Sequence, residues 1–141
     1  MELKECINFL LTNAQHNVFR YLSKRLSEYD ITPIQHGVLS CLMGKSYDTP
    51  KHLAENLSLE TSTISGILDR MQKKGLIDRV VNKEDRREVQ VRITEKGREL
   101  EDKIGIIIDE VNAEVLKNFT DDEIAYIKNS LRTIASGNFG E

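Results

Sequence analysis

A cluster of short hydroxyl side chains lies near the centre of the sequence. Its members are Thr61, Ser62, Thr63 and Ser65, and Gly66 follows them. Such residues lower helix propensity by up to about 1 kcal/mol each, so a helix selected only for stability would carry Glu, Lys or Ala instead. Hydroxyl groups can hydrogen-bond to phosphate oxygens or base edges, and small side chains let a helix backbone come close to such a ligand. The cluster therefore has the chemistry of a nucleic-acid-binding surface.

Each residue of this cluster also has a purely structural explanation. The hydroxyls could cap free N–H groups at a helix start, and Gly66 could allow close contact with another helix. One turn further on, Arg70 is placed to touch a phosphate, whereas Asp69 is expected to pair with Lys73 four residues later. The position of the whole set between a helix-turn-helix spacing and a hairpin favours nucleic-acid binding.

A run of six charged residues, 83–88, lies between two stretches rich in valine and isoleucine. The alternation over residues 89–93 predicts a strand, with residues 77–81 as its partner in a hairpin. The basic side chains at the hairpin tip are Lys83, Arg86 and Arg87. A solvated turn is the simplest explanation. Beside a helix in the major groove, however, such a loop can insert an arginine into the minor groove, and Asp85 is then expected to hold an arginine in position.

Helix start and stop signals indicate which secondary-structure elements contain the hydroxyl cluster and the charged run. Pro50 opens a short helix that runs to about residue 57, and a turn through residues 58–60 precedes a second helix, residues 61–74, which Gly75 ends. The predicted order is therefore helix, turn, helix, strand, loop, strand. Upstream, the sequence TPIQ at residues 32–35 is typical of a helix start, with a capping threonine, a proline and a glutamine.

Long amphipathic helices are predicted at both ends of the chain. Apolar residues recur every three or four positions from Ile7 to Leu26 and again from Leu100 to Val115, and a capping box at Thr120 starts a last helix. Helices of about 30 Å extend past the core of a domain this small, so they need another surface. A second copy of the chain is the simplest source of that surface, and an intramolecular helical hairpin is the alternative.

Composition bounds the class of protein. A chain of 141 residues with 39% hydrophobic and 30% charged residues predicts one soluble globular domain. It has neither an apolar run of roughly 20 residues nor a secretory signal, so a cytoplasmic location is expected. The net charge of −3 hides a basic middle: residues 51–98 carry 11 basic and 8 acidic side chains, whereas residues 99–141 carry 4 and 10. Only the middle suits an anionic surface.

Catalytic and metal-binding motifs are not recognisable. The histidines, His16, His36 and His52, lack metal-ligand spacing, and Cys6 and Cys41 form no CxxC or Cys/His cluster. The sequence contains no nucleophile elbow, phosphate-binding loop or dinucleotide fingerprint. We therefore expect neither an enzyme nor a cofactor or metal site.

From about residue 32 to residue 97 the chain resembles the winged helix-turn-helix of the multiple antibiotic resistance regulator (MarR) family. The resemblance rests on ITPIQHGVLSCL, on LAENLSLETSTISGILDRMQKKGLIDR and on NKEDRREVQVRITEKG. It implies a mainly α (α+β) fold, a winged helix-turn-helix with a two-stranded β-wing and long N- and C-terminal dimerisation helices. Residues 1–141 then form a single domain, with a DNA-binding lobe at 32–97 and a helical dimerisation lobe at 1–31 and 98–141.

The resemblance also implies roles for individual residues. In the family the DRR motif places an arginine in the minor groove, which corresponds to Arg87, and an acid at the start of the reading helix, here Glu60, can pair with it. Contacts at the front of that helix correspond to Ser62, Thr63 and Ser65. The full expected DNA-binding set is Thr61, Ser62, Thr63, Ser65, Gly66, Arg70, Lys83, Arg86 and Arg87, oriented by Glu60 and Asp85.

By the same resemblance the chain is a sequence-specific DNA-binding transcriptional regulator. A ligand-responsive repressor is implied, acting as a homodimer on a palindromic operator and released by a small amphipathic or phenolic effector. A winged-helix protein-interaction module without DNA activity is the alternative. The chain departs from the family at Gly66 and Lys83, where many members have arginine and proline, so the operator sequence does not follow. Peroxide-sensing members have their reactive cysteine at the position of Asn8, two residues after Cys6, so thiol sensing is unsupported.

Overall fold

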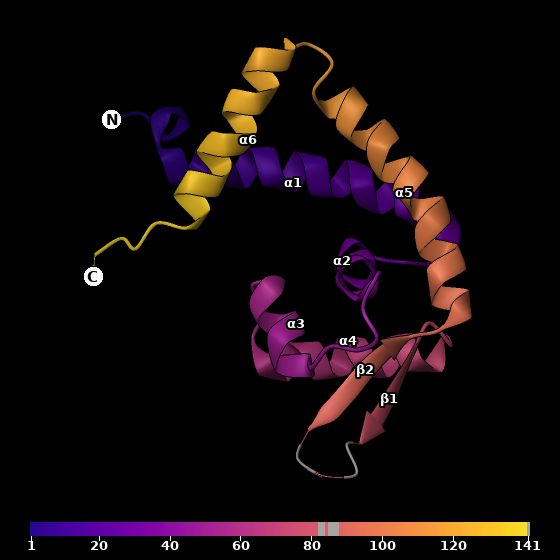
Figure 1. Cartoon of the computed structure of the whole chain (residues 1–141). Coiled ribbons are helices and arrows are strands. Elements are labelled where there is room, and N and C mark those ends of the chain that lie inside the picture. The colour runs from indigo at the N-terminus through magenta and orange to yellow at the C-terminus, as the bar shows by residue number, and fades with distance from the viewer. Residues whose placement is uncertain (82–83, 85–87, 141) are drawn as a thin grey trace. The chain divides into compact units, whose positions relative to one another are not determined.

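The chain folds into helices and one β-hairpin (Figure 1). The structure, a computed structural model, describes residues 1–81, 84 and 88–140. The main elements are α1 (Ile7–Leu26), α2 (Pro33–Leu42), α3 (Pro50–Asn56), α4 (Thr61–Lys73), β1 (Ile77–Val81), β2 (Val89–Ile93), α5 (Glu95–Val115) and α6 (Asp121–Ala135), with short 3-10 helices η1 (Leu3–Glu5) and η2 (Ser27–Tyr29) on either side of α1. Two compact units are distinguished, Met1–Ile108 and Asp109–Glu141, and α5 belongs to both.

The predicted helix starts are confirmed by their caps. The hydroxyl of Thr32 accepts a hydrogen bond from the N–H of Gln35 at 3.2 Å, and the Gln35 side chain accepts one from the N–H of Thr32, which closes a capping box. Thr120 forms the same kind of box at α6. After α4, Gly75 has a φ of +77°, a left-handed conformation that glycine adopts without strain. The chain can therefore turn directly from α4 into β1.

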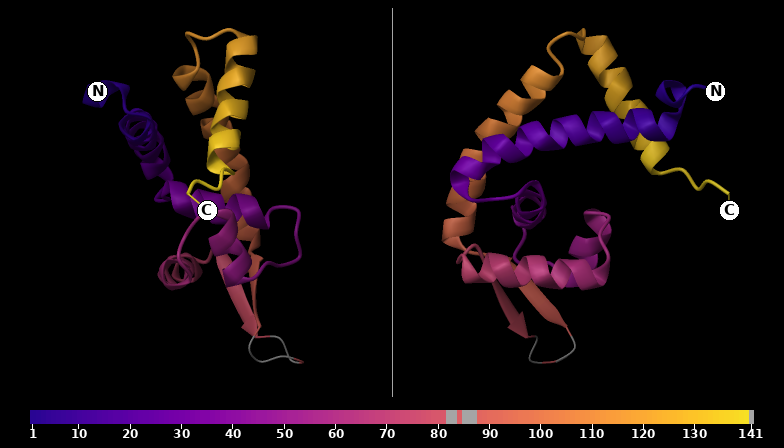
Figure 2. Two further views of the ribbon diagram at one scale, coloured as in Figure 1. Left: turned by 90° about the vertical axis from the view of Figure 1, so that its left-hand side faces the viewer. Right: turned by 180° about the vertical axis from the view of Figure 1, so that it is seen from behind.

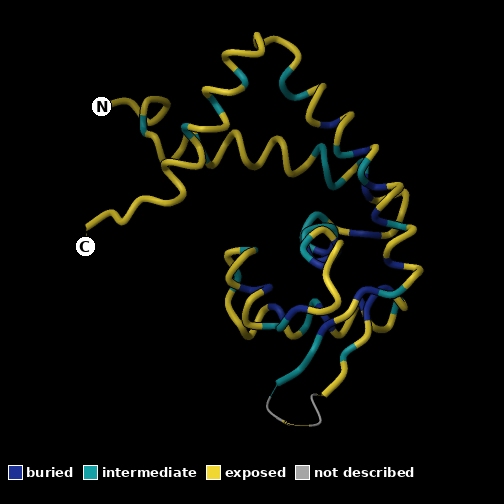
Figure 3. Tube along the Cα trace, viewed as in Figure 1, coloured by how far each residue is buried: buried dark blue, intermediate teal, exposed yellow. Residues whose placement is uncertain are grey.

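The core of the first unit lies among α2, α3, α4 and the base of the hairpin, where the buried positions gather (Figure 3). The helix α3 packs on α4, and the turn between them completes a helix-turn-helix. The buried side chains of these three helices include Val38, Leu39, Leu42, Leu53, Ile64, Leu68 and Met71. Because this apolar stripe fixes the inner face of α4, its opposite face is left for other contacts.

The hairpin forms a wing that projects beyond the helices of the first unit (Figure 2). Its strands pair antiparallel, with Ile77 opposite Ile93 and Val81 opposite Val89. Ile77 at the base and Val91 at the middle of the hairpin are fully buried, whereas Val81 near the tip is 54% exposed. The wing is therefore anchored at its base. The predicted fold class, a winged helix-turn-helix with a two-stranded β-wing, is confirmed.

The helices α1 and α6 bury few of their apolar side chains. In α1 Leu26 is the one buried residue, while Ile7 and Leu10 are 60% and 47% exposed. In the second unit α6 has no buried residue, and its Tyr126 and Leu131 are 76% and 47% exposed. None of the described helices has the length and apolarity to cross a membrane.

Candidate nucleic-acid interface

The first turn of α4 is open to solvent. The exposed hydroxyl residues there are Thr61, Ser62, Thr63 and Ser65. None of these hydroxyls makes a hydrogen bond to any residue that the structure describes, and the N-cap residue, Glu60, makes no capping bond either. The N–H of Thr63 donates to the Glu60 carbonyl at 3.0 Å, whereas the N–H groups of Thr61 and Ser62 make no hydrogen bond to a described residue, as is usual at a helix start. The front of α4 therefore presents donors and acceptors that local capping does not occupy.

Gly66 extends this surface by half a turn. Among the described residues, the single atom within 4 Å of a Cβ built at Gly66 is a guanidinium nitrogen of Arg70, at 3.5 Å. Because no other helix approaches, helix packing does not explain the glycine. Arg70 itself is exposed. Gly66, which has no side chain, and the guanidinium group of Arg70 thus lie next to each other on the outer face of α4.

Asp69 pairs with the wing, and the predicted pair with Lys73 is wrong. A carboxylate oxygen of Asp69 lies 2.6 Å from the Arg79 guanidinium of β1. The Nε of Arg79 also donates to the Gln72 side chain at 2.6 Å. The turn at Gly75 brings β1 back beside α4, so a residue ten positions away becomes a better partner than one four positions away. This clamp ties the first strand of the wing to the helix.

The tip of the wing lies outside the described residues. Four predicted residues fall there, namely Lys83, Asp85, Arg86 and Arg87. Their contacts with DNA, and the pairing of Glu60 with an arginine of the wing, stay predictions. Glu60 is exposed at the N-cap position of α4.

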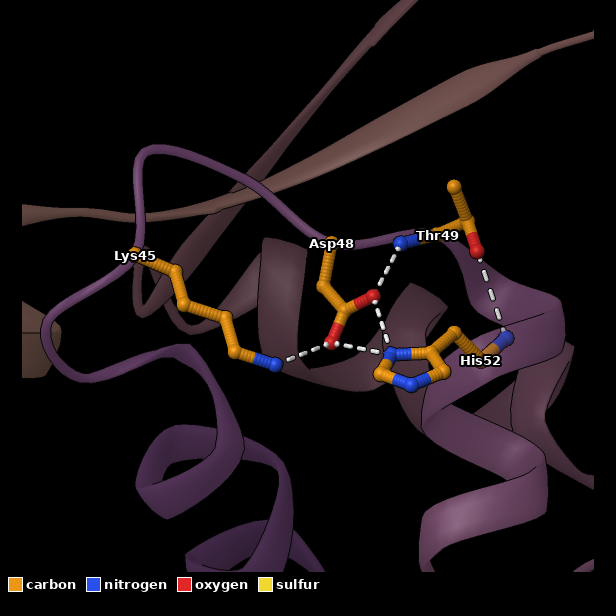
Figure 4. A network of polar contacts seen from close by, with 4 residues as sticks. All are labelled: Lys45, Asp48, Thr49 and His52. Atoms are coloured by element: carbon orange, nitrogen blue, oxygen red, sulfur yellow. Dashed lines mark hydrogen bonds and ion pairs between the residues drawn. The ribbon is translucent and has the colours of Figure 1, made fainter.

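Asp48, which sequence reasoning missed, lies beside the second strand of the wing. Its carboxylate accepts hydrogen bonds from the N–H of Thr49 at 2.8 Å, from Nδ1 of His52 at 2.8 Å and from Nζ of Lys45 at 3.1 Å (Figure 4). Its backbone pairs with Val91 of β2 through both N–H groups, at 2.9 and 2.7 Å. The network thus connects α3 to the wing.

The charge of Asp48 follows from these contacts. Burial by itself raises the pKa of a carboxyl, and Asp48 is only 6% exposed. The N–H of Thr49 and the side chains of Lys45 and His52 outweigh this effect, so the pKa of Asp48 lies below its ordinary value of 3.8. The carboxylate is therefore ionised at neutral pH, where it attracts the ammonium group of Lys45 and accepts the hydrogen bond of the His52 ring. A polar residue next to a helix start was the available signal in the sequence, but it does not reveal the partner strand.

Comparison with known proteins agrees with this geometry. Residues 29–88 match the sequence profile of the MarR family. Over 110 residues the chain is 36% identical to the HTH-type transcriptional regulator MgrA of Staphylococcus aureus, which covers 77% of this chain and 75% of MgrA. The chain belongs to the MarR family of transcriptional regulators. Members of the MarR family are transcription regulators and not enzymes.

Two solved structures share the fold over almost the whole chain. A mutant of MarR from Escherichia coli, complexed with operator DNA, is 29% identical, with a TM-score of 0.86 over 95% of this chain and 99% of that one. CouR from Rhodococcus jostii, bound to p-coumaroyl-CoA, is 25% identical, with a TM-score of 0.86 over 100% of this chain and 99% of that one. The helix-turn-helix and the wing of this chain therefore have the fold seen in the solved MarR structure.

Two further polar groups of this MarR family member, His36 and Cys41, interact with side chains of the first unit. His36 of α2 contacts the buried Glu101 of α5, with Nδ1 3.0 Å from a carboxylate oxygen. Burial raises the pKa of the half-buried Cys41 thiol above 9.0; Lys45 opposes this shift and Asp48 adds to it. A thiol with a raised pKa is a poor nucleophile. No group of three or more His, Cys, Asp or Glu residues in the described chain is arranged to hold a metal ion.

Proposed function

We propose that this chain is a sequence-specific DNA-binding repressor that acts as a homodimer on a palindromic operator. One observation carries the proposal: the unoccupied hydroxyls at the front of α4 lie on a helix that is clamped to a wing. The operator-bound MarR relative supports the same use of the fold. A rigid pair of this kind can contact a major groove and the adjacent minor groove together.

In this proposal the front of α4 enters the major groove. The hydroxyls of Ser62, Thr63 and Ser65 meet base edges or phosphates, and Gly66 lets the backbone approach. Thr61 and the free N–H groups of the first turn bind a phosphate, aided by the helix dipole. Arg70 contacts the phosphate backbone one turn further along, because its guanidinium lies exposed beside Gly66.

The wing supplies the minor-groove contact. Arg87 inserts into the groove with Arg86 beside it, and Lys83 binds a phosphate. Glu60 and Asp85 orient the inserted arginine by charge pairing. The basic excess of residues 51–98 supports this assignment, since the positive charge is gathered where the anionic ligand would bind.

The homodimer is supported by the burial pattern of the terminal helices. In α1 the apolar residues Ile7 and Leu10 are 60% and 47% exposed, and in α6 Tyr126 and Leu131 are 76% and 47% exposed. Apolar faces of this extent on long helices need a partner surface. In our proposal a second copy supplies it, and residues 1–31 and 98–141 form the dimerisation lobe around a twofold axis.

The effector is proposed to be a small amphipathic or phenolic molecule. Its support is the CouR relative bound to p-coumaroyl-CoA. In the first unit a hollow of about 370 Å³ has an apolar lining of Tyr29, Leu76 and Leu100, together with three lysines, Lys74, Lys96 and Lys103, and two acids, Asp30 and Glu99. An apolar lining with an excess of positive over negative side chains suits an aromatic acid. Such a compound would lower affinity in the DNA-binding assay described next.

The test is DNA binding by an Arg87→Ala variant. A fluorescent duplex from the region upstream of the chain's own gene is titrated with protein, and fluorescence anisotropy reports the affinity. Loss of an inserted arginine is expected to weaken binding by about tenfold or more, since such a contact is worth about 1–3 kcal/mol.

A matched control is Arg98→Ala, which removes an exposed arginine beyond the base of the wing. Its affinity should stay within about twofold of the parent protein. Light scattering should give the same dimer mass for both variants. A protein-interaction module would instead show no salt-dependent affinity for any duplex, and that outcome would overturn the proposal.

A further inference from the structure

The wing needs support on both of its edges. A hairpin of two strands is marginally stable by itself, and in this one the side chains of the pair nearest the tip, Val81 and Val89, are not buried. On the β1 edge, Arg79 ties the wing to Asp69 and Gln72 of α4. On the β2 edge, the backbone of Asp48 forms two hydrogen bonds with Val91, at 2.9 and 2.7 Å. Asp48 thus acts as a short third strand.

A strand pairing of this kind does not require a carboxylate. The bonds to Val91 use only the backbone of Asp48, which any residue except proline provides. Nor does α3 need the carboxylate as its cap, because the hydroxyl of Thr49 already accepts the N–H of His52 at 3.2 Å. Burying an acid is costly unless it is fully paired. The side chain of Asp48 therefore calls for a separate explanation.

That explanation lies in the origin of its three donors. Lys45 comes from the loop after α2, while Thr49 and His52 come from the start of α3 (Figure 4). The carboxylate holds the loop and the helix together at one point, which immobilises the backbone of Asp48. Since α3 packs on α4, the proposed reading helix, an unbroken series of contacts runs from α4 through α3 and Asp48 to β2.

We propose that the carboxylate of Asp48 is a positioning group for DNA binding, because it fixes the second strand of the wing relative to the reading helix. It touches no DNA itself. It acts through the wing tip, and the inference therefore rests on the proposed function. Arg79 and Asp48 then hold opposite edges of one hairpin, and both are needed to place Arg87.

The experiment is a double-mutant cycle between Asp48→Asn and Arg87→Ala, measured by anisotropy on the upstream duplex. Asparagine keeps the size and the backbone of Asp48 but loses the negative charge that attracts Lys45, and it replaces one of the two acceptor oxygens of the carboxylate by an NH₂ donor. Asp48→Asn should weaken binding by about tenfold in the parent protein. In the Arg87→Ala background it should cost less than about twofold, because the wing contact that it positions is already gone.

Controls separate positioning from general damage. Asp102→Asn removes a carboxylate of α5 that is exposed, and it should leave the affinity within about twofold of the parent. Urea unfolding establishes that each variant is folded under the assay conditions. If Asp48→Asn does not fold, His52→Ala tests the same network. His52 is exposed, and its substitution removes one donor to the Asp48 carboxylate. It should show a smaller loss with the same lack of additivity.

The outcomes are distinguishable. Full additivity of the two losses, or unchanged affinity of folded Asp48→Asn, overturns the positioning role while leaving the proposed function standing. Unchanged affinity of Arg87→Ala overturns the wing contact on which the inference rests, and the absence of salt-dependent affinity for any duplex overturns the proposed function itself. A loss that disappears in the Arg87→Ala background supports the positioning role, because a residue that merely stabilises the fold would cost the same in both backgrounds.

Discussion

The winged lobe, residues 32–97, and the terminal helices α1 and α6 bury their apolar side chains to different extents. In the winged lobe the apolar stripes of α2, α3 and α4 are covered by one another, and Leu39, Leu53 and Leu68 are at most 1% exposed. In α6, by contrast, no residue is buried. The same apolar periodicity therefore closes a core in one region and leaves an open face in the other. An amphipathic pattern shows that a helix has an apolar face but does not show what covers it.

The polar groups of the two regions differ in the same direction. The buried polar residues described in the winged lobe, Gln35 and Asp48, both make hydrogen bonds within that lobe. Among described residues, the buried side-chain polar atom without a partner is Ser23 Oγ of α1. A buried hydroxyl without a partner costs roughly 1–3 kcal/mol. The winged lobe is thus complete as a single chain, whereas α1 retains an unmet bond.

The largest effect should come from charging the open face of α6. Leu131→Asp places a carboxylate on an apolar face and is expected to give a monomer by light scattering. DNA affinity should then fall by about two orders of magnitude or more, because each half of a twofold operator would be bound independently. Asn129→Asp, on the same helix, adds the same charge at a polar position and should leave the mass unchanged. A monomeric parent protein would remove the basis of this prediction.

A smaller effect is expected from the clamp inside the winged lobe. Arg79→Gln removes the contacts with Asp69 and Gln72, and DNA affinity should fall roughly tenfold as the wing loses its fixed position. Stability should change by less than about 1 kcal/mol, since Arg79 and Asp69 are 29% and 52% exposed. The matched variant is Arg92→Gln, whose arginine contacts Gln90 of its own strand. Equal affinity losses in the two variants would argue against the clamp.

Local signals were sufficient to predict the helices and strands. Thr32 and Thr120 cap their helices as predicted, because a cap depends on residues only three positions away. The hairpin was predicted from its alternation, and its two strands have the predicted bounds. The family and its winged fold followed from motifs of the same short range.

Contacts between distant segments could not be predicted in this way. Asp69 has two cationic candidates, and helical spacing favours Lys73, but the turn at Gly75 makes Arg79 the actual partner. Asp48 meets Val91 across 43 positions of sequence, and nothing near either residue indicates the other. Both contacts hold the wing. The elements of the site are thus local features, while their relative placement depends on tertiary pairs that leave no local pattern.

The smallest effect is a difference in acid sensitivity between Asp48 of the winged lobe and Glu123 of the α6 capping box. The pKa of each carboxyl is lowered, for Asp48 by hydrogen bonds that overcome its burial and for Glu123 by the N–H and hydroxyl of Thr120. A lowered pKa in the folded state means that stabilisation is present above the unfolded pKa of about 4 and is lost as the pH falls through the folded value. Stability measured by urea unfolding from about pH 7 to about pH 3 should therefore converge, at the acid end, between the parent protein and Asp48→Asn.

The free energy of unfolding of Glu123→Gln should likewise approach that of the parent protein as the pH falls, but the difference between them at neutral pH should be smaller. Glu123 is exposed, so water and salt screen its interactions, whereas Asp48 is 6% exposed and its bonds are shielded. Raising the salt concentration should accordingly reduce the Glu123 effect more than the Asp48 effect. Equal salt sensitivity would mean that Asp48 is solvated in solution, and a solvated Asp48 could not hold the wing rigidly against α3.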